Sequence, residues 1–530
     1  MNKNIKNFIK YNKQILNSDI KYRGYIAVAD RQRAPVSLLS SIYISAYSNK
    51  FRLEPVIITD QLQGPSVKIF KSFGFKHFLL GFSYKKILSF QILVVVKTVL
   101  CFFYSLFKMI NINFDNFIKN YKVANVVIGD LVYDQYIRHN LAFKKPKVDF
   151  NFLIILFKAI FRVYNIDSYI NNYNFKLIFA TTEGNVNNNS ILLRVGVKKK
   201  IKCYLLAGYE YINVMQYKSS NIKLGAWNLK PLGISIKDFN KLKISENKLN
   251  KFLNSRFKGS LNTLRTSTVD LINANSNRSI SKKDLFNKLK INESFDKIVL
   301  VSPHVFSDAP HGLGTNFIFR DHYDQFLKTL EFIKSLNFGR ILWLIRPHPT
   351  SAHYNEQGIV KEIIKSLNIV NKNIYYCPKE IINTKDLIKI CDNAITGRGT
   401  IGLEFACYGK MPLIAGASVY SGFDLALEPK NQNEYFNFIK KIPLIKIMDK
   451  AKITLARKIF FYLETMYPNK INDNDNLNTK NKLSKIFEDN IMNKSKNDLF
   501  KPKIINNVRK FNFKDDALYK FYYNSISPYK

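Results

Sequence analysis

The chain has 530 residues, of which 46% are hydrophobic and 14% aromatic; this composition excludes a disordered protein, and the length exceeds what one ordinary hydrophobic core holds. Lysine and arginine number 82 against 39 aspartate and glutamate, and the net charge of +43 indicates an anionic partner, although an AT-rich genome also yields abundant lysine. Basic runs interleaved with aromatic residues and zinc-finger spacings are absent, so we expect no nucleic-acid partner.

Two features of the sequence bear on the cellular compartment. The segment 1–28 is polar and basic without a continuous apolar stretch, so we expect no signal peptide. The cysteines are odd in number and include no CxxC pair that could hold a metal or form a redox couple, which fits a reducing cytoplasm. The five cysteines are Cys101, Cys203, Cys377, Cys391 and Cys407.

Short apolar segments that end in polar residues recur in the first half of the chain, at 24–30, 54–60 and 176–184. Such segments are typical of buried parallel strands with loops at their carboxyl ends. We therefore predict an α/β domain over residues 1–235.

Two longer apolar stretches, 89–110 and 150–164, lie within this first domain. Lys97 interrupts the first near its middle, where a charge costs about 2.5 to 3.5 kcal/mol in a bilayer, and the second is too short to span one. We expect buried or membrane-facing helices and not a transmembrane span. Their apolar residues, flanked by Lys158 and Arg162, predict docking at an anionic membrane, hence a cytoplasmic protein peripheral to the inner membrane.

The segment 236–292 is rich in lysine and asparagine and predicts peripheral helices that bridge two domains. Within it, Ser281 and Asp284 have the spacing of a capping box, so we expect a helix to begin after Ser281.

Strand and helix candidates alternate regularly in the second half, over residues 293–440. This alternation predicts a parallel, doubly wound sheet whose ligands bind at the carboxyl ends of the strands. The predicted strands are 297–303, 340–347, 373–378, 392–397 and 411–416, and the predicted helices are 321–337, 355–368, 384–390 and 400–409.

Several candidate binding residues fall on that carboxyl edge. Arg346 and His348 follow a buried strand at prolines that stop its hydrogen-bonding ladder, and both could donate to phosphate oxygens. The glycine-rich turn after the next buried strand would present the backbone amides of Gly399, Thr400 and Ile401 to an anion. A tight strand-to-helix turn without a ligand is the alternative for this segment.

Glu404 lies one turn into the helix that follows the glycine-rich turn. Its carboxylate could accept hydrogen bonds from a ribose diol. The alternative is a solvated acid that the helix dipole favours near a helix start.

Together these motifs resemble the capsular polysaccharide biosynthesis proteins, which are similar to bacterial Kdo transferases of GT-B fold that use CMP-activated sugars. The His348–Pro349 pair resembles the HP motif that contacts the nucleotide phosphate in CMP-sugar transferases. The segments that carry the resemblance are 128–138, 302–314, 320–326, 345–356, 396–416 and 418–429.

The resemblance implies a GT-B-like α/β fold in which two Rossmann-like domains face a cleft, with extra helices. The first domain would bind a glycan or lipid-linked acceptor, and the second would bind a nucleotide-sugar donor, CMP-activated and Kdo-like. The last region, 441–530, would pack helices back on the first domain, beginning with 442–468. A DxD pair for a metal is absent from the expected place, so we expect metal-independent transfer without a cofactor.

The resemblance also implies roles for individual residues. A carboxylate from the first domain should activate the acceptor or attack the sugar, and Glu183 is the first candidate and Asp130 the second. The nucleotide would contact Ser302 and His304 in addition to Glu404. The remaining candidates for the donor-sugar side of the cleft are Asp308, Tyr420 and Ser421.

Three other activities stay open at this point. A nucleotide-sugar epimerase and a polymer glycerophosphotransferase would use a similar nucleotide-binding edge, and a noncatalytic protein of capsule assembly is the third alternative. An epimerase turns over without an acceptor, whereas either transferase requires one.

Overall fold

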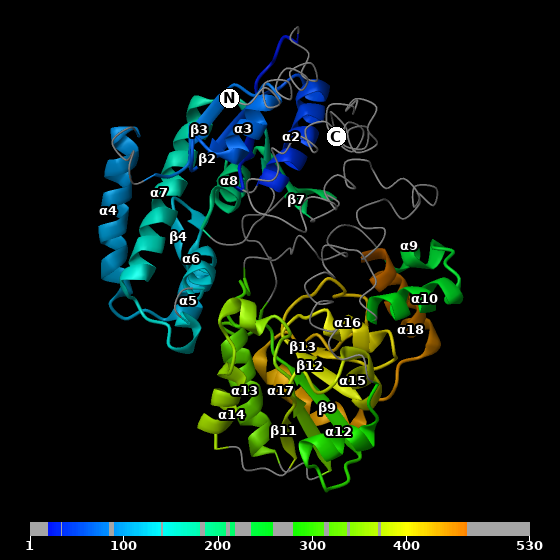
Figure 1. Ribbon diagram of the computed structural model, residues 1–530. Coiled ribbons are helices and arrows are strands. Elements are labelled where there is room, and N and C mark those ends of the chain that lie inside the picture. The colour runs from blue at the N-terminus through cyan, green and yellow to red at the C-terminus, as the bar shows by residue number, and fades with distance from the viewer. Residues whose placement is uncertain are drawn as a thin grey trace. The chain divides into compact units, whose positions relative to one another are not determined.

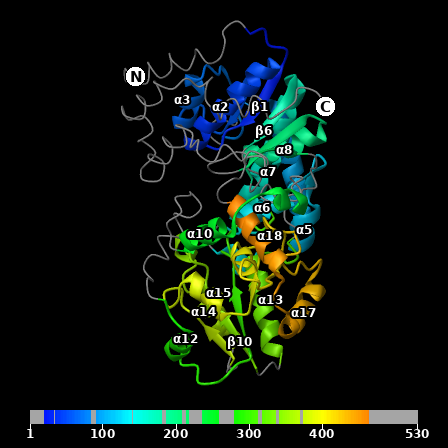
Figure 2. The same ribbon diagram turned by 90° about the vertical axis from the view of Figure 1, so that its right-hand side faces the viewer.

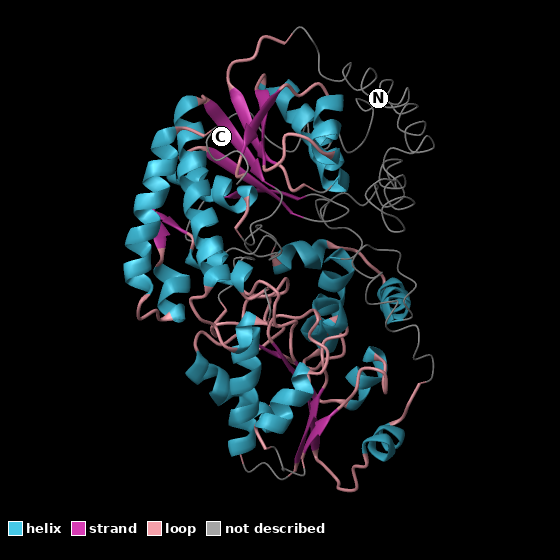
Figure 3. Cartoon of the chain, turned by 60° about the vertical axis from the view of Figure 1, so that its left-hand side comes forward, coloured by secondary structure: helices cyan, strands magenta, loops and turns pink. Residues whose placement is uncertain are grey.

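The computed structural model describes residues 20–32, 34–83, 90–138, 141–180, 186–207, 213–217, 235–257, 279–311, 317–336, 340–368 and 373–463. The chain forms two compact units. Unit 1 comprises Met1–Gln135, Val148–Asn221 and Asp475–Lys530, and unit 2 comprises Tyr136–Lys147 and Ile222–Asn474. Figure 3 shows strands with helices packed around them in each unit, which confirms the predicted α/β class with two doubly wound sheets.

The sheet of unit 1 has six strands in the order β3-β2-β1-β6-β7-β8. All neighbours are parallel except β8, which runs antiparallel to β7 at the edge. The predicted strands at 24–30, 54–60 and 176–184 are confirmed as β1, β2 and β6. The strands are β1 (Tyr25–Ala29), β2 (Glu54–Thr59), β3 (His77–Leu80), β6 (Phe175–Ala180), β7 (Lys202–Ala207) and β8 (Asn213–Tyr217).

Helices cover this sheet because its central strands carry apolar residues on both faces. The chain runs from β1 through α2 (Ala34–Phe51) to β2 on one side, and from β6 through α8 (Asn188–Lys198) to β7 on the other. The strand order reverses between β1 and β6, so the two crossovers run in opposite directions along the sheet. Because both are right-handed, these two helices lie on opposite faces of the sheet.

The two apolar stretches of the first half form the helices α4 (Ile92–Met109) and α7 (Phe150–Asn172), which pack against each other (Figure 1). Many side chains of α7 are buried, whereas only 22% of the residues of α4 are buried. By length and composition alone, α4 is apolar enough to cross a membrane. A small group of short elements follows α4, namely α5 (Phe114–Asn120), β4 (Lys122–Val123), β5 (Val126–Val127) and α6 (Gly129–Tyr136).

The sheet of unit 2 has five parallel strands in the order β11-β10-β9-β12-β13, so the order reverses between β9 and β12. All five predicted strands and all four predicted helices of this region are confirmed. Figure 2 shows β10 together with α13, α14 and α15 in this unit. The strands are β9 (Lys297–Ser302), β10 (Ile341–Ile345), β11 (Ile374–Tyr376), β12 (Asn393–Thr396) and β13 (Leu413–Ile414). The helices are α13 (His322–Ser335), α14 (Ile359–Ser366), α15 (Thr384–Ile390) and α16 (Ile401–Ala406).

Local sequence accounts for these boundaries. Every residue of β10 is buried, and the strand stops two residues before Pro347, which has no N–H for a ladder. The helix α12 (Lys282–Leu289) begins with the predicted capping box, in which the Ser281 side chain accepts from the Asp284 amide and the Asp284 side chain accepts from the Ser281 amide.

The helices that flank the second sheet come from segments that were predicted to lie outside this domain. The segment predicted as a bridge contributes α9 (Ile236–Lys241) and α10 (Glu246–Phe257) to unit 2. There α18 (Lys450–Phe461) packs on α9, α10 and α16. The apolar residues of α18 complete the core of unit 2, and the predicted packing of 441–530 on the first domain stays a prediction.

A glycine lets α16 approach the loop that follows β13. Gly402 lies on α16 against Tyr420, whose side chain is fully buried, and a methyl group at position 402 would overlap the Tyr420 hydroxyl. The fold therefore depends on the absence of a side chain at this position.

We expect Gly402→Ala to lower the free energy of unfolding by about 1 to 3 kcal/mol, the usual cost of overpacking a core. Tyr420→Phe removes the overlapping oxygen, so the double variant should be less destabilised than the sum of the two single variants. Urea unfolding of the four proteins, followed by circular dichroism, measures this coupling. Strict additivity would contradict the proposed overlap.

Candidate functional site

The carboxyl edge of the sheet in unit 2 brings the predicted binding residues together. Ser302 is the last residue of β9, Arg346 follows β10, and Gly397 follows β12. In doubly wound sheets, ligands bind outside the carboxyl ends of the strands where the strand order reverses. Here that point lies between β9 and β12, so the loop after Ser302 and the glycine-rich turn flank the expected position of a ligand.

Three histidines line up at this edge. The rings of His304 and His322 are stacked with their centroids 4.4 Å apart, and the ring of His348 lies 5.5 Å from that of His304. His322 is fully buried, and neither of its ring nitrogens has a hydrogen-bond partner among the described residues. A Cβ atom at Gly397 would lie 2.8 Å from His322 Nδ1, so the glycine makes room for this ring. We name His304, His322 and His348 the histidine row.

The histidine row is uncharged at neutral pH. Burial lowers the pKa of all three side chains, and His304 and His348 each oppose protonation of His322. For His348 burial is the largest cause, and together with His304, Arg346 and Lys379 it lowers the pKa to about 3.

The hydrogen bonds of His348 determine which of its nitrogens carries the proton. The backbone N–H of Thr350 donates to Nδ1 across 3.2 Å, and the Thr350 hydroxyl lies 2.8 Å from the same atom. Because a backbone N–H can only donate, Nδ1 is the acceptor and the proton of the neutral ring is on Nε2. His348 therefore presents an N–H donor without a net charge.

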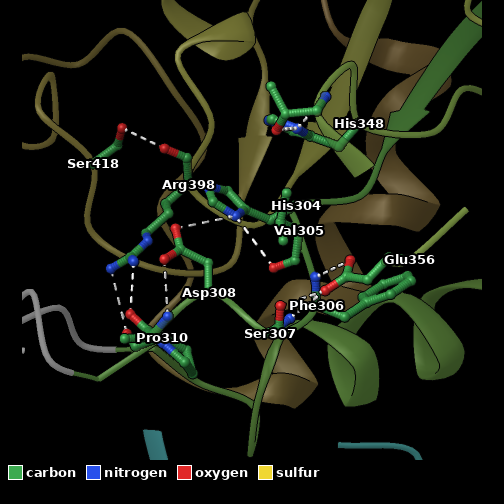
Figure 4. A network of polar contacts seen from close by, with 12 residues as sticks. His304, Val305, Phe306, Ser307, Asp308, Pro310, His348, Glu356, Arg398 and Ser418 are labelled. Atoms are coloured by element: carbon green, nitrogen blue, oxygen red, sulfur yellow. Dashed lines mark hydrogen bonds and ion pairs between the residues drawn. The ribbon is translucent and has the colours of Figure 1, made fainter. Parts of the chain in front are cut away.

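The carboxylate of Asp308 lies beside the ring of His304 (Figure 4). Its carboxylate lies 3.7 Å from His304 Nδ1 and 3.3 Å from a terminal nitrogen of Arg138. Burial raises the pKa of Asp308, but His304, Arg398 and Arg138 together outweigh burial and the net shift is downward. Asp308 is therefore ionised and lies beside Nδ1 of His304.

Two buried side chains hold the loop that carries His304 and Asp308. Arg398 donates to the carbonyl oxygens of Ala309 and Pro310, at 2.8 and 3.4 Å (Figure 4). Glu356 accepts hydrogen bonds from the amide of Phe306, and from the amide and hydroxyl of Ser307, all within 2.8 Å. These contacts hold the loop after β9 on both sides of Asp308.

The glycine-rich turn leads into α16. The backbone N–H groups of Gly399, Thr400 and Ile401 have no hydrogen-bond partner in the described part of the chain. Unpaired amides at a helix start can bind an anion, and phosphate binding by these three residues stays a prediction.

Tyr420 and Ser421, which were predicted to face the donor sugar, support the turn from within. The Tyr420 hydroxyl donates to the Gly399 carbonyl at 3.3 Å, and Ser421 Oγ accepts from the Ser418 amide at 2.8 Å. Both side chains are buried. The prediction is corrected here, because these residues shape the turn and do not face a ligand.

Arg346 and Glu404 also differ from prediction. The terminal nitrogens of Arg346 donate to the carbonyls of Lys379 and Ile382 and to the Thr384 hydroxyl, so Arg346 ties the end of β10 to that loop and does not reach for a phosphate.

Glu404 lies within the core of unit 2 and not at a ribose site. It is 5% exposed and pairs with Arg256 of α10 across 3.1 Å. This ion pair occupies a carboxylate oxygen that was predicted to accept from a ribose diol, so the pair joins α16 to α10 instead.

The two predicted catalytic carboxylates have different outcomes. Both oxygens of Asp130 accept from the guanidinium of Arg194 at 2.7 Å, and the Arg194 side chain is 1% exposed. Asp130 therefore neutralises a buried cation in unit 1, which corrects its assignment as a catalytic base. Glu183 lies outside the described residues, and its role stays a prediction.

The motifs contained three further site residues that the residue-level predictions omitted. His322, Arg398 and Arg138 lie in the segments 320–326, 396–416 and 128–138 that carried the family resemblance. The sequence signal that could have identified them is a charged or aromatic residue inside a segment that carries the resemblance. Among the described residues, the structure holds no group of three His, Cys, Asp or Glu side chains that could bind a metal ion.

Comparisons with known proteins give distant structural likenesses. No family model and no curated protein matches the sequence. A KpsC beta Kdo 2,4 transferase of Thermosulfurimonas dismutans matches at 12% identity, 54% coverage of this chain, 79% of that chain and a TM-score of 0.29.

Two further solved structures cover more of the chain. The UDP-GlcNAc 2-epimerase of Methanocaldococcus jannaschii matches at 10% identity over 83% of this chain and 98% of its own, with a TM-score of 0.23. Anabaena Alr3699/HepE, in complex with UDP-glucose, matches at 9% identity over 83% and 94%, with a TM-score of 0.25. At these scores the likenesses carry no argument about activity. A proposal about activity therefore rests on the residues at the carboxyl edge of the sheet in unit 2.

The histidine row makes stability depend on pH in a defined direction. Above pH 6.5, His322 is neutral in both the folded and the unfolded chain. Below it the unfolded chain binds a proton that the folded chain does not, so stability falls with falling pH. In His322→Phe the acid-side slope should be smaller by up to about 1.4 kcal/mol per pH unit.

Urea unfolding at intervals between pH 8 and pH 5 measures this slope. Phe keeps an aromatic ring against His304, so the variant should fold at pH 8. An unchanged slope in His322→Phe would contradict a neutral, buried His322.

Proposed function

We propose that the carboxyl edge of unit 2 binds the phosphate of a nucleotide-activated sugar, and that the protein is a metal-independent glycosyltransferase of capsular or lipopolysaccharide biosynthesis. The observation that carries this proposal is the neutral His348, with its N–H on Nε2, at the same edge as the unpaired amides of Gly399, Thr400 and Ile401. The resemblance of His348–Pro349 to the HP motif favours a CMP-activated, Kdo-like donor.

The proposed reaction transfers a sugar to a hydroxyl group of a glycan or lipid-linked acceptor. The acceptor oxygen bonds to the anomeric carbon, the bond from that carbon to the phosphate oxygen breaks, and the acceptor proton passes to a carboxylate, for which Glu183 is the proposed residue. Negative charge develops on the departing phosphate, where His348 Nε2–H and the turn amides would stabilise it. A neutral donor such as His348 can assist without first losing a proton.

A nucleotide-sugar epimerase is the second candidate. The carboxylate of Asp308 favours it, because it lies 3.7 Å from Nδ1 of His304 and a histidine beside a carboxylate is a common proton-transfer group. Product analysis separates the two activities: an epimerase converts its nucleotide sugar without an acceptor, whereas the transferase releases nucleotide only when acceptor is present.

The donor-site proposal predicts that a cytidine nucleotide raises the melting temperature of the protein. His348→Ala should weaken nucleotide binding by about 10-fold to 150-fold, the value of a hydrogen bond to a charged group. His348→Gln is the matched control, because its side-chain amide can place an N–H near the position of Nε2 and should retain part of the affinity.

A thermal-shift screen of cytidine, uridine, adenosine and guanosine nucleotides provides the measurement. A shift with uridine nucleotides alone would disprove the CMP assignment. If no nucleotide shifts the melting temperature, the enzyme proposal itself fails.

We also propose that the protein is cytoplasmic and docks on the anionic surface of the inner membrane. The support is α4, whose outward face exposes large apolar side chains: Ile92, Leu93, Val96, Leu100, Phe103, Tyr104 and Phe107. We name these seven residues the α4 stripe. With about 100° between successive residues, they fall within roughly a third of the helix circumference, as in a helix that lies flat on a bilayer.

This docking predicts binding to vesicles that contain phosphatidylglycerol, with affinity that falls steeply as salt rises. Phe103→Ser combined with Phe107→Ser should weaken binding at every salt concentration, since both side chains are more than half exposed and their loss leaves the core intact. Cosedimentation with vesicles measures both effects. Equal binding to neutral vesicles, or resistance to carbonate extraction from cells, would contradict a peripheral, charge-dependent attachment.

A further inference from the structure

A pocket of about 890 Å³ opens beside the α4 stripe in unit 1. Its walls come from α4, from α5 and from the segment that includes β4. Leu100 and Tyr104 belong to both the stripe and the pocket wall, so the two features form one continuous surface. Figure 1 shows α4 and α5 at the side of unit 1 away from its sheet.

The polar lining of this pocket is basic. Lys97 and Lys108 project from the flank of α4 next to the stripe, and Lys122 projects from β4; all three are exposed. No carboxylate lines the pocket, and the remaining polar groups are mainly asparagine amides and hydroxyls. The Lys108 ammonium lies 4.6 Å from the centre of the Tyr104 ring, which holds this cation at the boundary between pocket and stripe.

These features select a ligand with two parts. Three ammonium groups without a local carboxylate favour an anion, and phosphate is the anion that lipid head groups supply. An apolar stripe that continues from the pocket wall favours hydrocarbon chains attached to that anion. A soluble nucleotide would use the basic pocket but would leave the neighbouring stripe exposed to water.

We propose that this pocket binds the phosphate head group of an anionic membrane lipid, whose acyl chains extend from the pocket over the α4 stripe. The inference deepens the membrane docking proposed above and rests on it for its role in cells. It is independent of the donor site, because every residue that it uses lies in unit 1.

The experiment separates head-group binding from docking by using lipids that form no bilayer. Calorimetric titration of the full chain compares monomeric dihexanoyl phosphatidylglycerol with dihexanoyl phosphatidylcholine and with glycerol 3-phosphate. We expect the phosphatidylglycerol to bind at least about tenfold more tightly than either comparison, because it alone combines net negative charge with acyl chains.

Variants assign the binding to the pocket. Replacing Lys97, Lys108 and Lys122 together by glutamine should weaken binding of dihexanoyl phosphatidylglycerol by about tenfold or more. The control replaces an equal number of exposed lysines of unit 1 that do not line the pocket and should bind as the parent protein does. The control positions are Lys68, Lys76 and Lys119.

Each contrary result has its own meaning. Equal losses in the two triple variants would show attraction by overall charge and would overturn the pocket. Equal affinity for glycerol 3-phosphate and the lipid would overturn the lipid assignment in favour of a free phosphate compound. Vesicle binding without any binding of the short-chain lipid would leave docking standing and disprove the head-group site, whereas the reverse pattern would disprove docking alone.

Discussion

The parallel pairing of β9 with β10 on one side and with β12 on the other determines where the residues of the candidate site in unit 2 lie. This pairing brings three loops that are distant in sequence to one edge of the sheet. Each loop then supplies different groups to the site. The loop after β9 carries His304 and Asp308, the loop after β10 carries His348, and the glycine-rich turn follows β12. The continuous parallel registers of β9 with β10 and with β12 set where each strand ends, so they set the positions of the three loops.

Electrostatics at this edge combine neutral donors with fixed ions. The histidine row remains uncharged because burial disfavours the protonated rings, while Arg398 and Arg138 keep Asp308 ionised. A phosphate entering such a site would meet hydrogen-bond donors already oriented by Thr350 and by the turn. Little reorganisation would be needed as charge develops, which is the condition for electrostatic catalysis.

The second sheet could be predicted almost strand by strand because its strands are continuous apolar segments between glycines, prolines and polar residues. The capping box at Ser281 was equally clear from local spacing. The partners of charged residues were not predictable, since Arg346, Glu404 and Asp130 meet groups that are distant in sequence or arranged by a loop. For the same reason the packing of α18 on α9, α10 and α16 was not predictable: an amphipathic pattern shows that a face is buried and not which surface covers it.

The contact between Gly397 and the buried ring of His322 also constrains how this protein can change over time. A methyl group at position 397 would lie 2.8 Å from His322 Nδ1, so a chain that first exchanges the histidine for something smaller accommodates it more easily. A lineage that takes the first step gains a cavity beside the candidate binding edge, and with it room to alter what that edge accommodates. The pair thus links the diversification of ligand preference to a destabilised intermediate sequence.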